Sequence, residues 1–289
     1  MSKKTVLRLV IPEWHGGVNP NYVFGAELLS HIAPQDKDNE TIQIDVDTDF
    51  HKELLSKDGI DGGDFLLSQM KETERVLAEK QPDRLIVFGG DCSVTQVPFD
   101  YLSGKYKGSI GIIWLDAHPD MSNPAQSSHL HEMVLGNLLG QNSASEITQV
   151  KHPFESDKVI MGGLIEERLR EMDKACKESG LKILSPEELK ESSETVLQWI
   201  KTNGLKQIAV HWDLDVLSPL DFRSIYPSEP YTDADAFAAA VGRMSLNDVC
   251  RLLNDVSLEA EIVGLSITEH LPWDAFNLRK TLSGLPIFN

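Results

Sequence analysis

The sequence contains few cysteines and no long apolar run, and each shortage excludes a class of protein. Three cysteines occur in 289 residues. Their odd number and scattered positions favour a reducing environment over a disulfide framework. No apolar run approaches the roughly 20 residues of a transmembrane helix, and no N-terminal stretch resembles a signal peptide. We therefore expect a cytoplasmic protein without a membrane partner.

Positive charge is also scarce. The chain has 27 lysines and arginines against 45 aspartates and glutamates, a formal net charge of −18 at pH 7. Because nucleic-acid-binding proteins neutralise phosphates with a basic face, we expect no nucleic-acid partner. The acidic charge is compatible with binding of metal cations and of a positively charged substrate, although acidic surfaces also serve solubility alone.

Apolar runs alternate with amphipathic segments along the whole chain, and no linker or internal repeat divides it. The predicted strands are 5–11, 41–46, 84–89, 110–116, 158–163, 181–184, 206–212 and 260–267. The predicted helices are 22–32, 64–80, 94–103, 131–140, 165–179, 186–202, 233–240 and 245–256. This alternation indicates βαβ units and a mostly parallel sheet covered by helices. We predict one α/β domain over residues 1–289.

The most informative segment is 111–120, in which an apolar run ends in Asp116, His118 and Asp120. In an extended backbone, residues i, i+2 and i+4 project to the same side. Two carboxylates and an imidazole would therefore meet at the end of a buried strand. Since unpaired buried carboxylates are costly, a cation is their natural partner. We interpret the segment as a metal site.

Two other segments end in the same way. The run 208–215 ends in Asp213 and Asp215, and the run 85–93 passes through a Gly-Gly turn into Asp91 and Cys92. In an open parallel sheet, ligands bind in the crevice outside the carboxyl ends of the strands. The alternative for each single aspartate is that it caps the following helix or turn.

The three motifs resemble, in their order and spacing, the signatures of the ureohydrolases, the family of arginases, agmatinases and formiminoglutamases. They are Gly-Gly-Asp-Cys-Ser (89–93), Asp-Ala-His-Pro-Asp (116–120) and Asp-Leu-Asp (213–215). The resemblance implies a three-layer α/β/α sandwich around an eight-stranded, mostly parallel sheet. It also implies two manganese ions bridged by a hydroxide that hydrolyses a guanidinium-type carbon, and a homo-oligomer, either a trimer or a hexamer.

The resemblance also implies the metal ligands. One ion would bind Cys92, Asp116, Asp120 and Asp213, and the other would bind Asp116, His118, Asp213 and Asp215. Asp116 and Asp213 would bridge the two ions. Hard carboxylate ligands with one imidazole favour Mn²⁺, and a pair of such ions makes hydroxide available near neutral pH.

Cys92 departs from the family pattern, which has histidine at this position. A thiolate is softer than an imidazole and adds a negative charge, so Zn²⁺, Co²⁺ and Ni²⁺ become candidates beside Mn²⁺. Two alternatives remain open. The first metal site is weakly occupied, or Cys92 is a small buried residue whose sulfur is turned away from the site.

Three residues match the substrate side of the family's site. His131 matches the proton-shuttle histidine, and Glu269 matches the glutamate that forms a salt link to the substrate guanidinium. His129 stands where an asparagine normally binds an amino-acid substrate, so recognition of free arginine is the least supported. The alternatives are solvated loop histidines and a surface glutamate.

Further departures from the family lie nearby. Ser266 stands where many members have aspartate, and the segment 216–232 lacks the usual Gly-rich Thr-Pro sequence. His15 is interpreted as a loop residue. His211 points with Asp213 by alternation and is interpreted as a packing residue.

The sequence therefore favours a binuclear-metal hydrolase that cleaves a C–N bond of a small cationic guanidino or amidino compound. Candidate substrates are agmatine, guanidino acids, formiminoglutamate and, least supported, arginine. Two alternatives remain open. One is a catalytically degenerate relative that acts as a binding or regulatory protein, and the other is a hydrolase of a different amide-like substrate.

Overall fold

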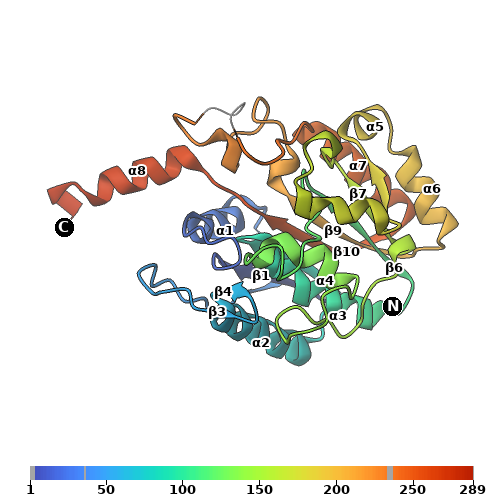
Figure 1. The fold of residues 1–289 in the computed structure, drawn as a ribbon, viewed down its shortest axis with the longest axis horizontal. Coiled ribbons are helices and arrows are strands. Elements are labelled where there is room, and N and C mark those ends of the chain that lie inside the picture. Colours follow the sequence, from blue (N-terminus) through green and yellow to red (C-terminus); the bar gives the residue numbers. More distant parts are fainter. Residues whose placement is uncertain (1–3, 36, 233–236, 289) are drawn as a thin grey trace.

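The computed structural model describes residues 4–35, 37–232 and 237–288. Its centre is a sheet of eight strands in the order β2-β1-β5-β10-β9-β6-β7-β8 (Figure 1). The strands are β1 (Val6–Ile11), β2 (Glu40–Gln43), β5 (Arg84–Gly89), β6 (Ile110–Leu115), β7 (Val159–Gly162), β8 (Lys182–Leu184), β9 (Gln207–Asp213) and β10 (Glu261–Thr268). All neighbouring pairs are parallel. The eight predicted strands are confirmed. A small hairpin of β3 (Ser56–Lys57) and β4 (Ile60–Asp61) was not predicted.

Helices cover both faces of the sheet, as predicted for a three-layer α/β/α sandwich. One face packs against α2 (Gly63–Lys80), α3 (Gln96–Tyr106) and α4 (Val134–Leu138). The other packs against α1 (Asn21–Ile32), α5 (Pro186–Glu191), α6 (Glu194–Thr202) and α7 (Leu246–Glu259). Strand β6 shows why both faces need a covering layer. All its residues are buried, and its apolar side chains alternate between the two opposite cores. A strand buried on both faces is typical of a parallel sheet.

Several predicted helices differ in the structure. Residues 165–179 form two 3₁₀ helices, η4 (Glu166–Arg168) and η5 (Glu171–Glu178), instead of one α-helix. Amphipathic spacing alone does not separate i+3 from i+4 hydrogen bonding, so the sequence did not reveal this. The predicted helix 131–140 begins with a 3₁₀ turn, η2 (Leu130–Met133), before the short α4.

The predicted helix 186–202 is two helices. Ser192 has an extended backbone (φ −160°) that ends α5, and its hydroxyl accepts a hydrogen bond of 3.0 Å from the backbone N–H of Glu194 at the start of α6. Serine competes in this way for backbone donors and favours helix ends. Of the predicted helix 233–240, residues 233–236 lie outside the described residues, and 237–240 are not helical.

Helix α8 (Trp273–Ser283) was not predicted and extends away from the rest of the molecule (Figure 1). Only its first residue, Trp273, is buried. Among the helices of the described ranges, none combines the length and hydropathy that crossing a bilayer requires.

Four adjacent strands in the middle of the sheet position the candidate site. They lie in the order β5, β10, β9 and β6, and each has a predicted site residue at its carboxyl end or shortly after it. These residues are Cys92, Glu269, Asp213 and Asp116. The sheet order thus joins motifs that are far apart in the sequence.

The N-terminus of α7 offers a test of the local sequence signals. Ser245 accepts a hydrogen bond from the backbone of Asp248 at 3.2 Å, and the Asp248 carboxylate accepts one from the backbone of Ser245 at 3.0 Å. We expect Ser245→Ala to lower the free energy of unfolding by about 1 kcal/mol, because it removes a helix cap. The measurement is urea denaturation. Ser257→Ala, at an exposed site late in the same helix, is the control and should change stability by less than about 0.5 kcal/mol. Equal effects of the two variants would contradict the capping role.

Candidate active site

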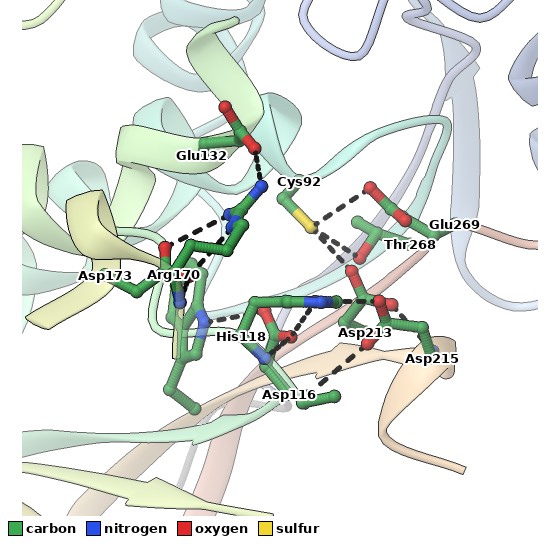
Figure 2. A network of polar contacts seen from close by, with 12 residues as sticks. Cys92, Asp116, His118, Glu132, Arg170, Asp173, Asp213, Asp215, Thr268 and Glu269 are labelled. Atoms are coloured by element: carbon green, nitrogen blue, oxygen red, sulfur yellow. Dashed lines mark hydrogen bonds and ion pairs between the residues drawn. The ribbon is translucent and has the colours of Figure 1, made fainter. Parts of the chain in front are cut away.

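The predicted ligands come together at the carboxyl ends of the central strands (Figure 2). Asp116 is the first residue after β6, Asp213 ends β9, and Cys92 opens the 3₁₀ helix η1 (Cys92–Thr95) after β5. All three are at most 2% exposed. Asp215 and Asp120 are also buried, and His118 is partly buried. The strand-end geometry predicted from the motifs is therefore present.

Short contacts connect these side chains. The Cys92 thiol donates to Asp213 Oδ2 at 2.8 Å, and its sulfur lies 3.9 Å from Glu269 Oε1. The sulfur thus points into the cluster, which contradicts the alternative that it is turned away. His118 Nδ1 lies 3.0 Å from Asp215 Oδ2 and 3.5 Å from Asp116 Oδ1.

The backbone holds two of the carboxylates in place. Asp116 Oδ1 accepts a hydrogen bond of 2.6 Å from the N–H of His118, and Asp213 Oδ1 accepts one of 2.7 Å from the N–H of Asp215. Each aspartate bonds the residue two positions ahead, as Asx-turns do. The i, i+2 spacing therefore fixes the orientation of the Asp116 and Asp213 carboxylates, as well as the side of the strand on which the ligands lie.

The described residues include three groups of potential ligands, and within each group the ligand atoms lie within 4.8 Å of one another. They are Asp116, His118 and Asp215; Cys92, Asp116, Asp120 and His211; and Cys92, Asp213 and Glu269. The first two correspond to the two predicted ion sites, except that neither contains Asp213 and that one contains His211. The predicted bridging role of Asp213 remains a prediction.

The potential ligand atoms of this site suit divalent cations. Among the described residues, His118 Nε2, Asp120 Oδ2 and His211 Nε2 are buried without a hydrogen-bond partner. Each such atom costs about 1–3 kcal/mol unless something binds it. Carboxylate oxygens and imidazole nitrogens converging in one buried place are the ligands that Mn²⁺ and related ions use.

A cavity of about 440 Å³ opens above this cluster. Its wall includes His118, Asp213 and Glu269 together with His131 and His129. His131 Nδ1 contacts the carbonyl oxygen of Gly16 at 2.7 Å, and the ring centroids of the two histidines lie 5.8 Å apart. The structure thus places all the predicted substrate-side residues on one pocket wall.

Two of the site residues have unusual backbone geometry. Asp120 (φ +47°) and Glu269 (φ +60°) lie in the left-handed region, which costs about 1–3 kcal/mol for a residue with a side chain. The N–H of Glu269 donates to the carbonyl of Gly90 at 2.7 Å, which helps to hold it there. Such conformations persist where the surroundings fix them, and they cluster at functional sites.

Comparison with known proteins agrees with this geometry. The model of the arginase family matches residues 26–225. The chain belongs to the arginase family. It is 25% identical over 235 residues to arginase 1 of Arabidopsis thaliana mitochondria, which covers 78% of this chain and 57% of the plant protein. It is 24% identical over 243 residues to an arginase of Staphylococcus aureus, with 76% and 78% covered.

Solved structures of the arginase family share the fold. The arginase of Entamoeba histolytica in complex with L-ornithine superposes with a TM-score of 0.77 at 17% identity, covering 99% of this chain and 100% of that one. The formimidoylglutamase of Bacillus subtilis gives a TM-score of 0.60 at 15% identity, with 94% and 81% covered. The chain spans 57% of the length of the plant arginase, which is the longer protein in that comparison.

The sequence did not identify Arg170, which lies on the pocket wall. Its guanidinium binds Asp173 through Nε at 2.8 Å and also pairs with Glu132 (Figure 2). No motif marks Arg170, because it lies in the segment predicted as a plain amphipathic helix.

Two of the other predicted residues have structural roles. His15 lies in the loop after β1, as interpreted, where it is buried, contacts Glu13 through Nδ1 and stacks on Phe65 with ring centroids 4.7 Å apart. Asp91 caps η1 by accepting from the backbone of Ser93 at 2.9 Å, as the capping alternative states.

The electrostatics of the site reflect many buried charges of one sign. Burial, with repulsion from Asp215, raises the pKa of Asp116 to about 6. Burial likewise raises the pKa of Glu269 to about 8 and the pKa values of Asp120 and Asp213 well above their usual range. Burial alone would raise the pKa of Asp215, but the adjacent His118 lowers it below its ordinary value. Several carboxyl groups of the cluster therefore bind protons more tightly than usual, and bound cations would displace these protons.

The raised pKa values predict how the stability of the metal-free protein depends on pH. Glu269 has a folded-state pKa of about 8 against 4.5 in a model peptide. The pKa of His118 is raised too, since Asp215 outweighs the effect of burial. Both groups bind protons more tightly in the folded chain, so their stabilisation is lost as pH rises through the folded pKa. The contribution of Glu269 is complete below pH 4.5 and is lost by about pH 8. We therefore expect the free energy of unfolding of chelator-treated protein to fall between pH 5 and pH 8.

The measurement is chemical denaturation at several pH values. The variant Glu269→Gln should show a shallower decline, because it lacks one of the titrating groups. A stability that stays constant or rises over this interval would contradict the proposed protonation of the cluster.

Proposed function

We propose that this protein is a binuclear-metal hydrolase that cleaves a C–N bond of a guanidino or amidino compound. The observation that carries the proposal is the convergence of unpaired carboxylate and imidazole atoms at the base of a pocket whose wall holds His131 and Glu269. Membership of the arginase family supports it.

The ions would be held by residues from both predicted sites. Asp116, His118 and Asp215 would hold one ion, and Asp116 and Asp120 would contribute to the other, near Cys92 and Asp213. Mn²⁺ suits the carboxylate ligands, and Cys92 keeps Zn²⁺, Co²⁺ and Ni²⁺ as candidates. When bound, two such ions supply a water of lowered pKa as the nucleophile.

Glu269 would bind and orient the substrate. An amidinium group offers two parallel N–H donors, which match the two oxygens of a carboxylate. Burial keeps Glu269 protonated more readily than an ordinary glutamate, and a cationic partner would favour its ionised form again. Glu269 and a cationic substrate would thus stabilise each other's charge at the base of the pocket.

His131 would hold the proton for the leaving nitrogen. Burial alone would lower its pKa, but Glu269 and Glu132 raise it above the ordinary value. The raised pKa favours the protonated ring, which is the form that a general acid requires. Its Nδ1 is bound to the Gly16 carbonyl, which fixes the ring on the pocket wall.

The pocket rim bears on the choice of substrate. Glu132 and Asp173 already offset the charge of Arg170, and Glu229 adds a carboxylate to the wall. A net negative rim favours a substrate whose far end is cationic, such as agmatine, over the guanidino acids, formiminoglutamate and arginine, which carry a carboxylate.

A panel of guanidino and formimino compounds tests the proposal. The protein is purified, its metals per chain are counted, and the release of urea, ammonia or formamide is measured. We expect turnover on at least one compound and its loss in Asp213→Ala. Asp64→Asn, an exposed carboxylate paired with Lys57, is the control and should retain full activity.

Two further variants separate the roles of the pocket residues. We expect His131→Asn to lower kcat by about 10²- to 10⁴-fold with little change in KM, as loss of a general acid does. Glu269→Gln is expected to raise KM, because it removes the charge that binds the substrate. Two metals without turnover on any compound would favour a different amide substrate. No metal at all would favour a binding or regulatory protein.

A further inference from the structure

His211 is the buried histidine on strand β9 that lies two residues before Asp213. It is fully buried. The sheet register pairs it with Ser266 on β10 and with Trp114 on β6. The three side chains therefore occupy one level of the sheet, one step below the aspartates at the strand ends.

Two contacts fix the orientation of the His211 ring. The Trp114 ring stacks on it, with centroids 3.7 Å apart and planes inclined by 16°. Its Nδ1 lies 2.9 Å from Thr95 Oγ1, which in turn lies 2.7 Å from Ser266 Oγ. One edge of the ring is thus anchored to a chain of neutral hydroxyl groups.

The opposite edge of the ring has no such anchor. Nε2 is buried and has no hydrogen-bond partner among the residues that the structure describes. His211 offers a ligand atom within 4.8 Å of those of Cys92, Asp116 and Asp120. Because Thr95 occupies Nδ1, Nε2 is the atom that is available. Asp120 Oδ2, in the same group, likewise has no hydrogen-bond partner within the described part of the chain.

We propose that His211 is a ligand of the metal ion bound by Asp116 and Asp120, and that it supplies from β9 the imidazole that position 92 lacks. This inference rests on the metal site of the proposed function. In this assignment Nδ1 donates to Thr95 Oγ1 and the lone pair lies on Nε2, which is the form of histidine that binds metals.

The arrangement connects two departures from the family pattern. Cys92 replaces the family's histidine, and Ser266 replaces an aspartate that many members have. Ser266 ends the hydroxyl chain that orients His211 through Thr95. A neutral imidazole also adds no negative charge, so a ligand set that includes His211 does not require a thiolate.

Metal binding by His211→Asn is the main test. Asparagine retains a donor for Thr95 but does not reach the position of Nε2. We expect equilibrium dialysis with Mn²⁺ or Co²⁺ to give two ions per chain for the unaltered protein and one for the variant. The lost ion should bind more than about 100-fold more weakly, because even removing a partner that only orients a ligand costs about 10- to 100-fold.

Controls separate ligation from packing. His270→Asn alters another buried histidine, whose Nδ1 contacts the carbonyl of Gly25 at 3.0 Å and which belongs to none of the ligand groups; it should keep both ions. Thr95→Val removes only the orienting hydroxyl and should weaken the same ion by about 10- to 100-fold. Cys92→His added to His211→Asn should restore the second ion.

A second measurement needs no variant. In the Co²⁺-loaded protein, each ligating imidazole retains one exchangeable N–H, whose proton resonance is strongly shifted by the paramagnetic ion. We expect two such resonances, from His118 and His211. One resonance, or two tightly bound ions in His211→Asn with an unchanged Co²⁺ spectrum, would overturn the assignment while leaving the metal site intact. No ion in the unaltered protein would overturn this inference together with the proposed function.

Discussion

Repulsion among buried carboxylates at the carboxyl edge of the sheet is the constraint on which the site depends. Asp116, Asp120, Asp213, Asp215 and Glu269 are all at most 7% exposed. In a folded chain without ions, this charge is reduced by protonation and by the contact between His118 and Asp215. Both the raised pKa values and the unpaired ligand atoms follow from the same crowding.

The fold supplies the force that keeps these charges together. Parallel strands buried on both faces hold their ends in fixed register, and the same strands contribute apolar side chains to the cores on both sides. The apolar burial is spread over the whole sheet, whereas the electrostatic cost is confined to a few residues at one edge. The protein can therefore bear a site that would be unstable by itself.

Much of the fold was predictable because buried strands are marked by local composition. Most of the sheet strands, such as β1, β5 and β6, appear as apolar runs. Alternation placed Asp116, His118 and Asp120 on one side of one strand end, and Asp213 and Asp215 on one side of another. The 3₁₀ helices η4 and η5 were not predictable, since the amphipathic spacing of this segment does not distinguish i+3 from i+4 hydrogen bonding. Helix α8 was also missed, because it buries little of its surface and its sequence has no strong apolar face.

The roles of single side chains were harder to predict than the elements that carry them. His211 was interpreted as packing, which is correct for its contact with Trp114 but leaves out its unpaired nitrogen. Alternation gives the side of the strand, whereas the direction of the His211 ring depends on Thr95 in η1 and Ser266 in β10. The left-handed backbone of Asp120 and Glu269 likewise has no local sequence signal.

The hydrogen bond between Cys92 and Asp213 has a consequence for the order of events at this site. It joins the ends of β5 and β9 across the intervening β10, so the thiol proton occupies a lone pair of Asp213 Oδ2. Any cation that is to use this oxygen must first displace that proton or share the carboxylate with it. The thiol and an ion thus compete for one oxygen atom of Asp213. The rate at which the ion binds depends on how readily the hydrogen bond between Cys92 and Asp213 breaks.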